Sequence, residues 1–340
     1  MSLPPETGGL SAAELQQIAA LIPVGTCVAV VAPGGGAPDQ ANVERGVALL
    51  QAMGCTVRNF YQPEQRYQRF GATDEARVAH LHEAARDPEV DVLLALRGSY
   101  GVSRILPMID FELLAASGKP LVGYSDITAL HLALLAKTGA VSFAGPMLNG
   151  DFGGLTLNAG TLRGFWQTLT QPRSSIHSRP QLADGTPSCG DSAPDAHNPA
   201  LNCSGTLWGG NLAMVTHLLG TPYFPQIEGG ILFLEDVNEH PFRVERMLLQ
   251  LEYAGVLQQQ KAIVLGDFSG YRLAPAIDNG YDFGAMLAFL RSRLRTPLMT
   301  GLPFGHVPDL GTLAVGSHAE LRSTGADGFS LEMSGYPVLR

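Results

Sequence analysis

Apolar strand-like runs alternate with helix-like patterns along most of this chain. Val28 to Ala32 and Val92 to Leu96 are unbroken apolar runs, as expected for strands that are covered on both faces of a sheet. Amphipathic stretches with a helical period lie between such runs, and one of them stops at Gly54. This alternation predicts an α/β fold built on a doubly wound, mostly parallel sheet.

A chain of 340 residues is longer than one typical core and indicates two domains. Residues 171–204 contain more Pro, Asn and Ser and are typical of loop chemistry. We therefore predict an N-terminal α/β domain at 1–170, a linker or long surface insertion at 171–204, and a smaller C-terminal α/β domain at 205–340. The tail of the last domain, from Thr312 to Leu339, is typical of short strands.

Composition and charge narrow the class of protein. Hydrophobic residues make up 45% of the chain, and the net charge of −9 argues against a nucleic-acid partner. No apolar run reaches membrane-spanning length, and the first residues lack a basic region followed by an apolar block. We expect a cytoplasmic protein that has neither a membrane partner nor a secretory signal.

The four cysteines and the histidines give no metal-binding pattern. Cys27 and Cys55 lie in apolar surroundings and are predicted to be buried thiols, whereas Cys189 and Cys203 lie in a polar loop and could pair. A reducing cytoplasm would oppose that pairing. No His-Glu-x-x-His spacing is present, so we predict no metal.

Ser125 stands directly between an apolar strand and a helix. Leu121 and Val122 precede it, and a helical pattern closed by Gly139 follows. This is the setting of a nucleophile elbow, although the generic Gly-x-Ser-x-Gly signature is not met. A helix cap is the simpler interpretation of Ser125, and the stretch alone favours it, because strand-to-helix junctions in any α/β protein need caps.

Two further junctions carry residues that suit a serine hydrolase. Glu235 ends an apolar strand, and His306 lies in a loop rich in Gly and Pro. Imidazole can take the proton of a serine hydroxyl, and a carboxylate can orient the imidazole. Asp236 and Glu239 are rivals of Glu235, and strand alternation places Glu235 and Asp236 on opposite faces.

An oxyanion hole requires two N–H donors. Asp126 follows the serine at the helix start and can supply one of them. The Gly98-Ser99 turn at the end of the neighbouring strand can supply the other. The earlier turn Pro33-Gly34-Gly35-Gly36 matches neither a dinucleotide fingerprint nor a P-loop, so we interpret it as a plain Gly-rich loop beside a cleft.

Seven ordered blocks between residues ~70 and 306 resemble the LD-carboxypeptidase family of serine peptidases. They are Phe70-Gly71-Ala72-Thr73-Asp74-Glu75-x-Arg77, Arg97-Gly98-Ser99-Tyr100-Gly101 with Arg104-Ile105-Leu106-Pro107, Gly123-Tyr124-Ser125-Asp126, Gly205-x-Leu207-x-Gly209-Gly210-Asn211-Leu212, Gly220-Thr221-Pro222, Leu234-Glu235-Asp236 and Leu302-Pro303-x-Gly305-His306.

The resemblance implies Ser125 as nucleophile, His306 as base and Glu235 as the orienting acid. It implies a flavodoxin- or glutamine-amidotransferase-like N-terminal domain, a smaller C-terminal domain that shares the site, a homodimer, and no cofactor. The implied reaction releases terminal D-Ala from the murein tetrapeptide L-Ala-γ-D-Glu-meso-diaminopimelate-D-Ala during cell-wall recycling. We expect Asp126 and Ser99 to supply the oxyanion N–H groups. The residues expected to contact substrate are Arg97, Gly98, Tyr100 and Asn211.

The chain departs from the usual pattern of this family at Ser99, where the turn normally reads Arg-Gly-Gly-Tyr-Gly. A serine at positive φ costs about 1 kcal/mol relative to glycine. Two other functions remain open: a peptidase for a peptidyl-nucleotide antibiotic, like the microcin C self-immunity branch of the family, or a binding protein without turnover. Trp166 or Trp208 could stack on a nucleotide base, although a role in the core is expected for both.

Overall fold

The computed structural model describes residues 9–178, 198–325 and 328–340. Two compact units divide the chain. Unit 1 comprises residues 1–172, 308–316 and 336–340, and unit 2 comprises residues 173–307 and 317–335. No helix in the described part of the chain is long and apolar enough to cross a membrane.

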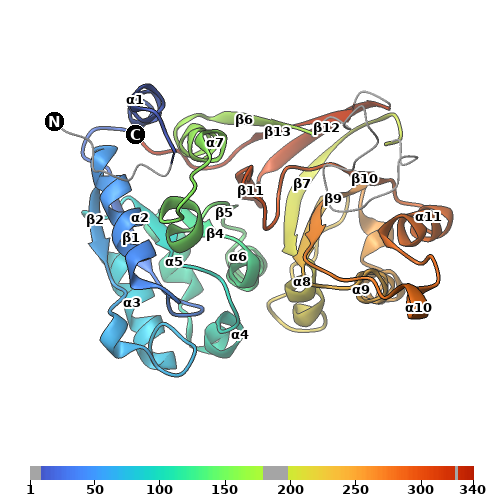
Figure 1. Ribbon diagram of the computed structural model, residues 1–340, viewed down its shortest axis with the longest axis horizontal. Coiled ribbons are helices and arrows are strands. Elements are labelled where there is room, and N and C mark those ends of the chain that lie inside the picture. The colour runs from blue at the N-terminus through green and yellow to red at the C-terminus, as the bar shows by residue number, and fades with distance from the viewer. Residues whose placement is uncertain (1–8, 179–197, 326–327) are drawn as a thin grey trace. The chain divides into compact units, whose positions relative to one another are not determined.

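Unit 1 is built on a six-stranded sheet in the order β11-β5-β4-β3-β1-β2 (Figure 1). Its first five strands in sequence pair in parallel, and β11 adds to β5 antiparallel. The strands are β1 (Cys27–Val31), β2 (Thr56–Asn59), β3 (Val92–Ala95), β4 (Leu121–Gly123), β5 (Ser142–Ala144) and β11 (Leu313–Val315). This arrangement confirms the predicted doubly wound, mostly parallel sheet, with the 2-1-3-4-5 order of flavodoxin-like folds.

Helices cover both faces of this sheet. Across the sheet, the chain passes from β1 to β2 in one direction and from β2 through β3 and β4 to β5 in the other. Right-handed crossovers therefore place α2 on one face of the sheet and α3, α5 and α6 on the other. The helices are α1 (Ala12–Ala19), α2 (Gln40–Ala52), α3 (Asp74–Arg86), α4 (Val102–Ile105), α5 (Phe111–Ser117), α6 (Thr128–Thr138) and α7 (Ala159–Thr170). Ser11 and Glu14 form a capping box at the start of α1.

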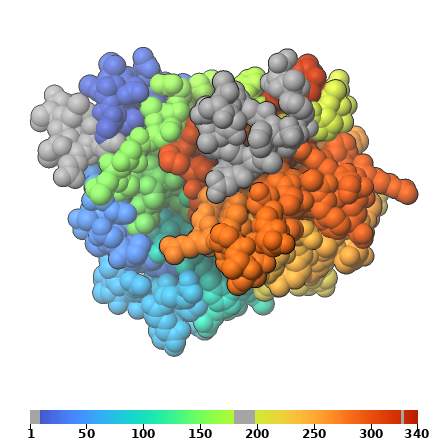
Figure 2. Space-filling view, turned by 45° about the vertical axis from the view of Figure 1, so that its right-hand side comes forward, coloured from blue at the N-terminus to red at the C-terminus, as the bar shows by residue number. Residues whose placement is uncertain are grey.

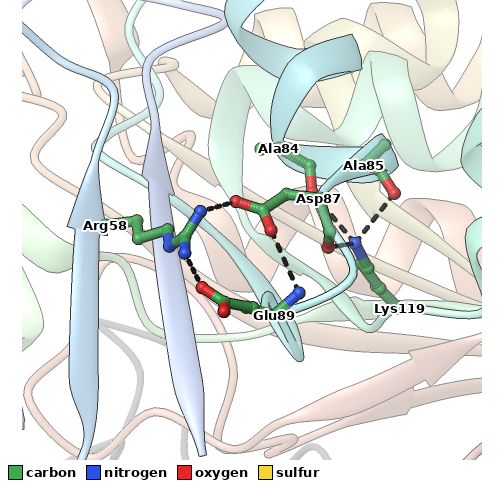
Figure 3. Close-up of polar contacts among 6 residues, drawn as sticks. All are labelled: Arg58, Ala84, Ala85, Asp87, Glu89 and Lys119. Atoms are coloured by element: carbon green, nitrogen blue, oxygen red, sulfur yellow. Dashed lines mark hydrogen bonds and ion pairs between the residues drawn. The ribbon is translucent and has the colours of Figure 1, made fainter.

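The C-terminal end of α3 is fastened to the strands on either side of it (Figure 3). The ammonium of Lys119, just before β4, donates to the carbonyl oxygens of Ala84 and Ala85 at 3.1 and 2.8 Å and to that of Asp87. Arg58 of β2 pairs with the carboxylates of Asp87 and Glu89. The contacts of Lys119 satisfy carbonyls that a helix end leaves without partners, and they fix the start of the strand that leads to Ser125.

Unit 2 is built on a seven-stranded sheet in the order β10-β9-β8-β7-β12-β13-β6 (Figure 1). The pairs from β10 to β7 are parallel, and those from β7 to β6 are antiparallel. The strands are β6 (Arg173–His177), β7 (Leu201–Asn211), β8 (Ile231–Val237), β9 (Ala262–Ser269), β10 (Leu298–Thr300), β12 (His318–Gly325) and β13 (Gly328–Ser334). The helices are α8 (Leu212–Leu218), α9 (Pro241–Tyr253), α10 (Pro275–Asp278) and α11 (Phe283–Arg293).

The outer surface of unit 2 includes the stretch with α10 and α11, which is orange in Figure 2. Exposed apolar side chains on this stretch are Leu273, Ile277 and Phe289. The apolar side chains of β8 and β9 are instead buried on both faces, as the unbroken apolar runs of the sequence predict.

The division into units differs from the predicted domain boundaries. Both described ends of the 171–204 segment are strands of the second sheet, because β6 pairs with β13 and β7 pairs with β12. Residues 308–316 and 336–340 belong to unit 1 rather than to a continuous C-terminal domain. The predicted short strands of the tail are present as β11, β12 and β13.

Cys27 and Cys55 are buried, as predicted. Burial raises the pKa of the Cys55 thiol to about 12. Cys203 lies in β7 as a free thiol, and its predicted pairing partner, Cys189, lies outside the described residues.

Candidate active site

Ser125 lies at the carboxyl end of β4 in a left-handed backbone conformation, with φ of +61°. The residues Ser125–Ile127 form a short 3₁₀ turn, and α6 begins directly after it. No side chain caps the first residues of the 3₁₀ turn or of α6, and none of the hydrogen bonds among the described residues uses Ser125 Oγ. The interpretation of Ser125 as a helix cap is therefore wrong, and the sharp, strained turn of a nucleophile elbow is present.

The Arg97–Gly101 turn at the end of β3 lies directly against this elbow. A Cβ atom added at Gly98 would lie 2.9 Å from Ser125 Cβ and 3.2 Å from the Asp126 nitrogen. Only glycine allows the two backbones this separation. The structure thus brings Gly98, Ser125 and the Asp126 N–H together, and the role of the Asp126 and Ser99 N–H groups as an oxyanion hole stays a prediction.

Ser99 has φ of +60°, so the substituted residue does occupy the conformation that glycine favours. Its hydroxyl accepts a hydrogen bond of 2.8 Å from Arg69 Nη2. Tyr100 is exposed and its ring packs on that of Phe70, while Arg97 Nη1 donates to the Gly36 carbonyl oxygen at 3.2 Å.

The Gly-rich turn after β1 supports the Arg97–Gly101 turn from behind. Gly35 N–H donates to the Gly98 carbonyl oxygen at 2.9 Å, and a Cβ at Gly34 would lie 2.6 Å from that same oxygen. These glycines serve close packing of two turns, which agrees with the interpretation of a plain Gly-rich loop. This packing role was not predicted from the sequence, although the adjacent glycines of the turn could have indicated a close approach of two backbones.

The Asp126 side chain joins the elbow to the turn. Its Oδ2 accepts a hydrogen bond of 2.9 Å from the Val102 N–H, while the carboxyl is buried. Burial raises the pKa of Asp126 to about 7, against the lowering effect of the Val102 hydrogen bond and of Arg77 and Arg69. Sequence reasoning used only the backbone N–H of this residue and missed its side chain.

In unit 2, Glu235 and His306 form a hydrogen-bonded pair. His306 Nδ1 lies 2.9 Å from Glu235 Oε2, and the Glu235 carboxylate is fully buried. If Nδ1 carries the proton that is donated to the carboxylate, Nε2 is the ring atom that can accept a proton. The structure therefore joins two of the three predicted triad residues directly.

Asn211 lies beside Glu235 at the end of the neighbouring parallel strand. Its Nδ2 donates to Glu235 Oε1 at 3.1 Å and to Asp236 Oδ1 at 3.0 Å, and its Oδ1 caps α8 at the Met214 N–H. This geometry gives Asn211 a positioning role, and its contact with substrate stays a prediction.

Glu235 and Asp236 do not lie on opposite faces as simple alternation predicts. The β8–β9 register shifts between Leu234 and Asp236, and both carboxylates reach the one amide of Asn211. Asp236 binds the start of α8 through the Ala213 N–H, and burial followed by the nearby Glu235 raises the pKa of Asp236 to about 6. Glu239, the other rival, pairs with Arg243 one helical turn away.

The loop that carries His306 is packed on the end of β9. The Asp267 N–H donates to the Phe304 carbonyl oxygen at 2.7 Å, and a Cβ at Gly266 would lie 2.2 Å from that oxygen. The buried Phe304 ring packs edge-on against Phe233, two residues before Glu235, with ring centroids 5.2 Å apart. This packing fixes the imidazole relative to the carboxylate.

Three other histidines lie on helices, His80 and His82 on α3 and His131 on α6. In the described part of the chain, no three His, Cys, Asp or Glu side chains are grouped so that they could hold a metal ion.

Comparison with known proteins decides the family. The sequence patterns of the LD-carboxypeptidase N-terminal domain and C-terminal domain match residues 28–145 and 204–321, respectively. This chain belongs to the LD-carboxypeptidase family. The predicted resemblance is confirmed, and the protein is a serine-type carboxypeptidase, a hydrolase.

Three members of the LD-carboxypeptidase family illustrate the range of similarity. The crystal structure of muramoyltetrapeptide carboxypeptidase from Oxalobacter formigenes is 47% identical, covers 92% of this chain and all of its own, and superposes with a TM-score of 0.83. A probable murein peptide carboxypeptidase of Bacillus subtilis is 34% identical over 72% of each chain. The microcin C7 self-immunity protein MccF of Escherichia coli is 28% identical over 80% of this chain and 83% of its own.

Proposed function

We propose that this enzyme hydrolyses the bond between an L-centre and a terminal D-amino acid, releasing D-Ala from murein tetrapeptide in cell-wall recycling. The observation that carries the proposal is the 2.9 Å hydrogen bond between His306 Nδ1 and the buried Glu235 carboxylate. It is supported by the strained elbow at Ser125 and by the similarity to murein peptide and muramoyltetrapeptide carboxypeptidases.

In the proposed mechanism, Ser125 Oγ attacks the scissile carbonyl carbon and His306 Nε2 takes the hydroxyl proton. Glu235 holds the imidazole in the required tautomer and stabilises the imidazolium. The N–H groups of Asp126 and Ser99 bind the oxyanion of the tetrahedral intermediate. Collapse breaks the C–N bond, and the amine of the D-amino acid leaves with the proton held by His306.

Water then completes the reaction. His306 removes a proton from a water molecule, which attacks the acyl-enzyme carbonyl and forms a second tetrahedral intermediate. Its collapse releases the shortened peptide as a carboxylic acid and returns the proton to Ser125 Oγ. All of these steps use residues of the chain itself.

The test is mass spectrometry of free murein tetrapeptide after incubation with the wild type, Ser125→Ala and His306→Ala. We expect the wild type to remove one alanine, and each variant to lose about 10³-fold or more in kcat, because the nucleophile or its base is absent. Ser292→Ala is the matched control, because this exposed hydroxyl donates, among the described residues, to the Phe289 carbonyl oxygen of its own helix. Near wild-type activity in Ser125→Ala would reject the proposed nucleophile.

A peptidyl-nucleotide substrate is the second candidate, favoured by the similarity to the microcin C7 self-immunity protein. Neither tryptophan can stack on its base, because Trp166 and Trp208 are both buried, as their expected core role requires. Cleavage of an aspartyl-adenylate analogue, with no release of D-Ala from the tetrapeptide, would favour this substrate. Binding of either compound without turnover would instead favour a non-catalytic binding protein.

Two further properties belong to the same proposal. We expect a homodimer in the cytoplasm, as the family resemblance implies. Light scattering on the purified protein would test the dimer, and cell fractionation would test the location.

A further inference from the structure

Three arginines gather around the turn that lies against the nucleophile. Arg97 begins this turn, and the positive charges of Arg69 and Arg66, together with a larger effect of burial, lower the pKa of its guanidinium. The three guanidinium groups donate to neutral oxygens: Arg97 to Gly36 O, Arg69 to Ser99 Oγ and Arg66 to Ala37 O. Within the described ranges, none of the three forms an ion pair with a carboxylate.

Two other arginines of unit 1 are paired with a carboxylate instead. Arg77 and Arg104 both pair with the Asp74 carboxylate. The buried Asp126 carboxyl, whose pKa Arg69 helps to lower, uses Oδ2 to accept the Val102 N–H. The cluster of Arg66, Arg69 and Arg97 therefore keeps an excess of positive charge, which attracts an anion.

Arg69 is held in place by its backbone as well as by Ser99. It follows Gln68, whose φ is +54°, in a tight turn in which the Phe70 N–H donates to the Tyr67 carbonyl oxygen. The Arg69 carbonyl oxygen accepts a hydrogen bond of 3.0 Å from the Gly36 N–H. Of the five N–H donors of the guanidinium, one is directed to Ser99 Oγ at 2.8 Å, so donors remain for a ligand.

The position of Arg69 suits one particular anion. Its guanidinium contacts Ser99, and Gly98, the residue before it, lies against Ser125. In a peptide that is cut at its last bond, the free carboxylate is attached to the carbon that carries the scissile nitrogen. When Ser125 attacks the carbonyl carbon, this carboxylate must lie only a few ångströms from the Gly98-Ser99 turn.

We propose that Arg69, assisted by Arg97, binds the free C-terminal carboxylate of the peptide and so restricts cleavage to the last residue. The inference rests on the proposed peptidase function and deepens it. The planar guanidinium matches a carboxylate with two parallel hydrogen bonds. Ser99 orients Arg69 for this contact. The serine hydroxyl therefore has a role at a position where the family usually has glycine.

The experiment compares murein tetrapeptide with the same peptide carrying a C-terminal amide. Release of D-Ala or D-alaninamide gives kcat/KM for each substrate with the wild type, Arg69→Gln and Arg69→Lys. We expect the wild type to prefer the acid by about 10- to 100-fold, the range for a hydrogen-bonded charged group. Arg69→Gln should lose most of that preference through a higher KM for the acid, and Arg69→Lys should keep part of it.

Arg86→Gln is the matched control, because it removes an equal charge from the exposed end of α3, about 18 Å along the helix from Asp74. It should behave as the wild type. An acid-to-amide ratio that is unchanged in Arg69→Gln would overturn the inference, as would an equal loss on both substrates, which indicates that Arg69 only supports the turn. If the wild type cleaves neither peptide, the proposed function itself fails and the inference falls with it.

Discussion

Two serines of unit 1 hold a backbone conformation that side chains disfavour. Ser99 and Ser125 have φ of +60° and +61°, and each such residue costs about 1 kcal/mol or more. They lie on adjacent turns that meet at Gly98. Strain of this kind persists where the surrounding structure holds it in place, and here the surrounding structure is the packing of Gly34, Gly35 and Gly98.

The carboxyl of Asp126 should make stability depend on pH. Its pKa is raised to about 7 in the folded protein because it is buried, so the native state binds the proton more tightly than the unfolded chain. This contribution to stability is complete at pH below about 4, the usual aspartate value, and is lost as pH rises through about 7. Relative to Asp126→Asn, the wild type should lose up to about 4 kcal/mol of unfolding free energy across this interval.

Urea denaturation of both proteins at a series of pH values would measure this difference. Asp236, whose pKa is also raised, titrates in both proteins and therefore cancels. Asparagine retains an oxygen that can accept the Val102 N–H. A stability difference that stays constant from pH 4 to 8 would contradict the assigned burial effect.

The sequence did not predict the conformation or position of several single residues. The junction at Ser125 could be located from its flanking strand and helix, but a cap and an elbow differ in φ, which no residue pattern reveals. Arg69 lies in an exposed turn without periodicity, so nothing in the pattern separates it from other surface arginines. Family resemblance identified Glu235 over Asp236, whereas strand alternation failed because of the shift in register.

At the scale of elements, the His306 loop depends on one close approach to β9. A methyl group at Gly266 would lie 2.2 Å from the Phe304 carbonyl oxygen, so the loop must move to accommodate Gly266→Ala. A displacement of about 1 Å in a catalytic group can lower kcat by about 100-fold. We therefore expect kcat to fall by this order in Gly266→Ala, while the Ser125 elbow in unit 1 is unaltered.

Gly164→Ala offers a matched comparison, since nothing lies within 4 Å of the added methyl group in the middle of α7. It should keep wild-type kcat and gain slightly in stability from better helix propensity. Thermal unfolding of both variants would distinguish loss of the fold from a displacement of the His306 loop in a folded protein. Wild-type kcat in Gly266→Ala would show that the loop tolerates the shift.

The elements themselves were largely predictable from the sequence. Apolar runs and helical periods located β1, β3, β8 and β9, because their side chains are buried on both faces of a sheet. Polar β6 was missed: its residues Arg173–His177 alternate between exposed and half-buried positions and include three hydrophilic side chains in succession. These residues form a strand because they pair with β13.

At the scale of the whole molecule, unit 1 is not a continuous piece of chain. β11 comes from residues 308–316 and covers the edge of β5, and the Leu339 N–H donates to the Leu169 carbonyl oxygen from the C-terminal tail. A fragment of residues 1–172 leaves that edge unpaired, and unpaired edges favour aggregation. We expect the fragment to aggregate or to unfold without a cooperative transition.

A fusion of residues 1–172 to residues 308–316 through a Gly/Ser linker is the comparison for this prediction. Restoring β11 should improve solubility and sharpen the transition seen by circular dichroism. A fragment of 1–172 that unfolds cooperatively by itself, as well as the fusion does, would contradict the structural role given to β11.

The late position of β11 also sets an order of events on the ribosome. The strands β1 to β5 and Ser125 emerge early, but the strand that completes their sheet emerges only after His306 has been made. A nascent chain therefore carries an open sheet edge through most of its synthesis, a period in which such edges invite misassembly. Completion of the sheet that carries Ser125 is thereby postponed until the segment that bears His306 has already been translated.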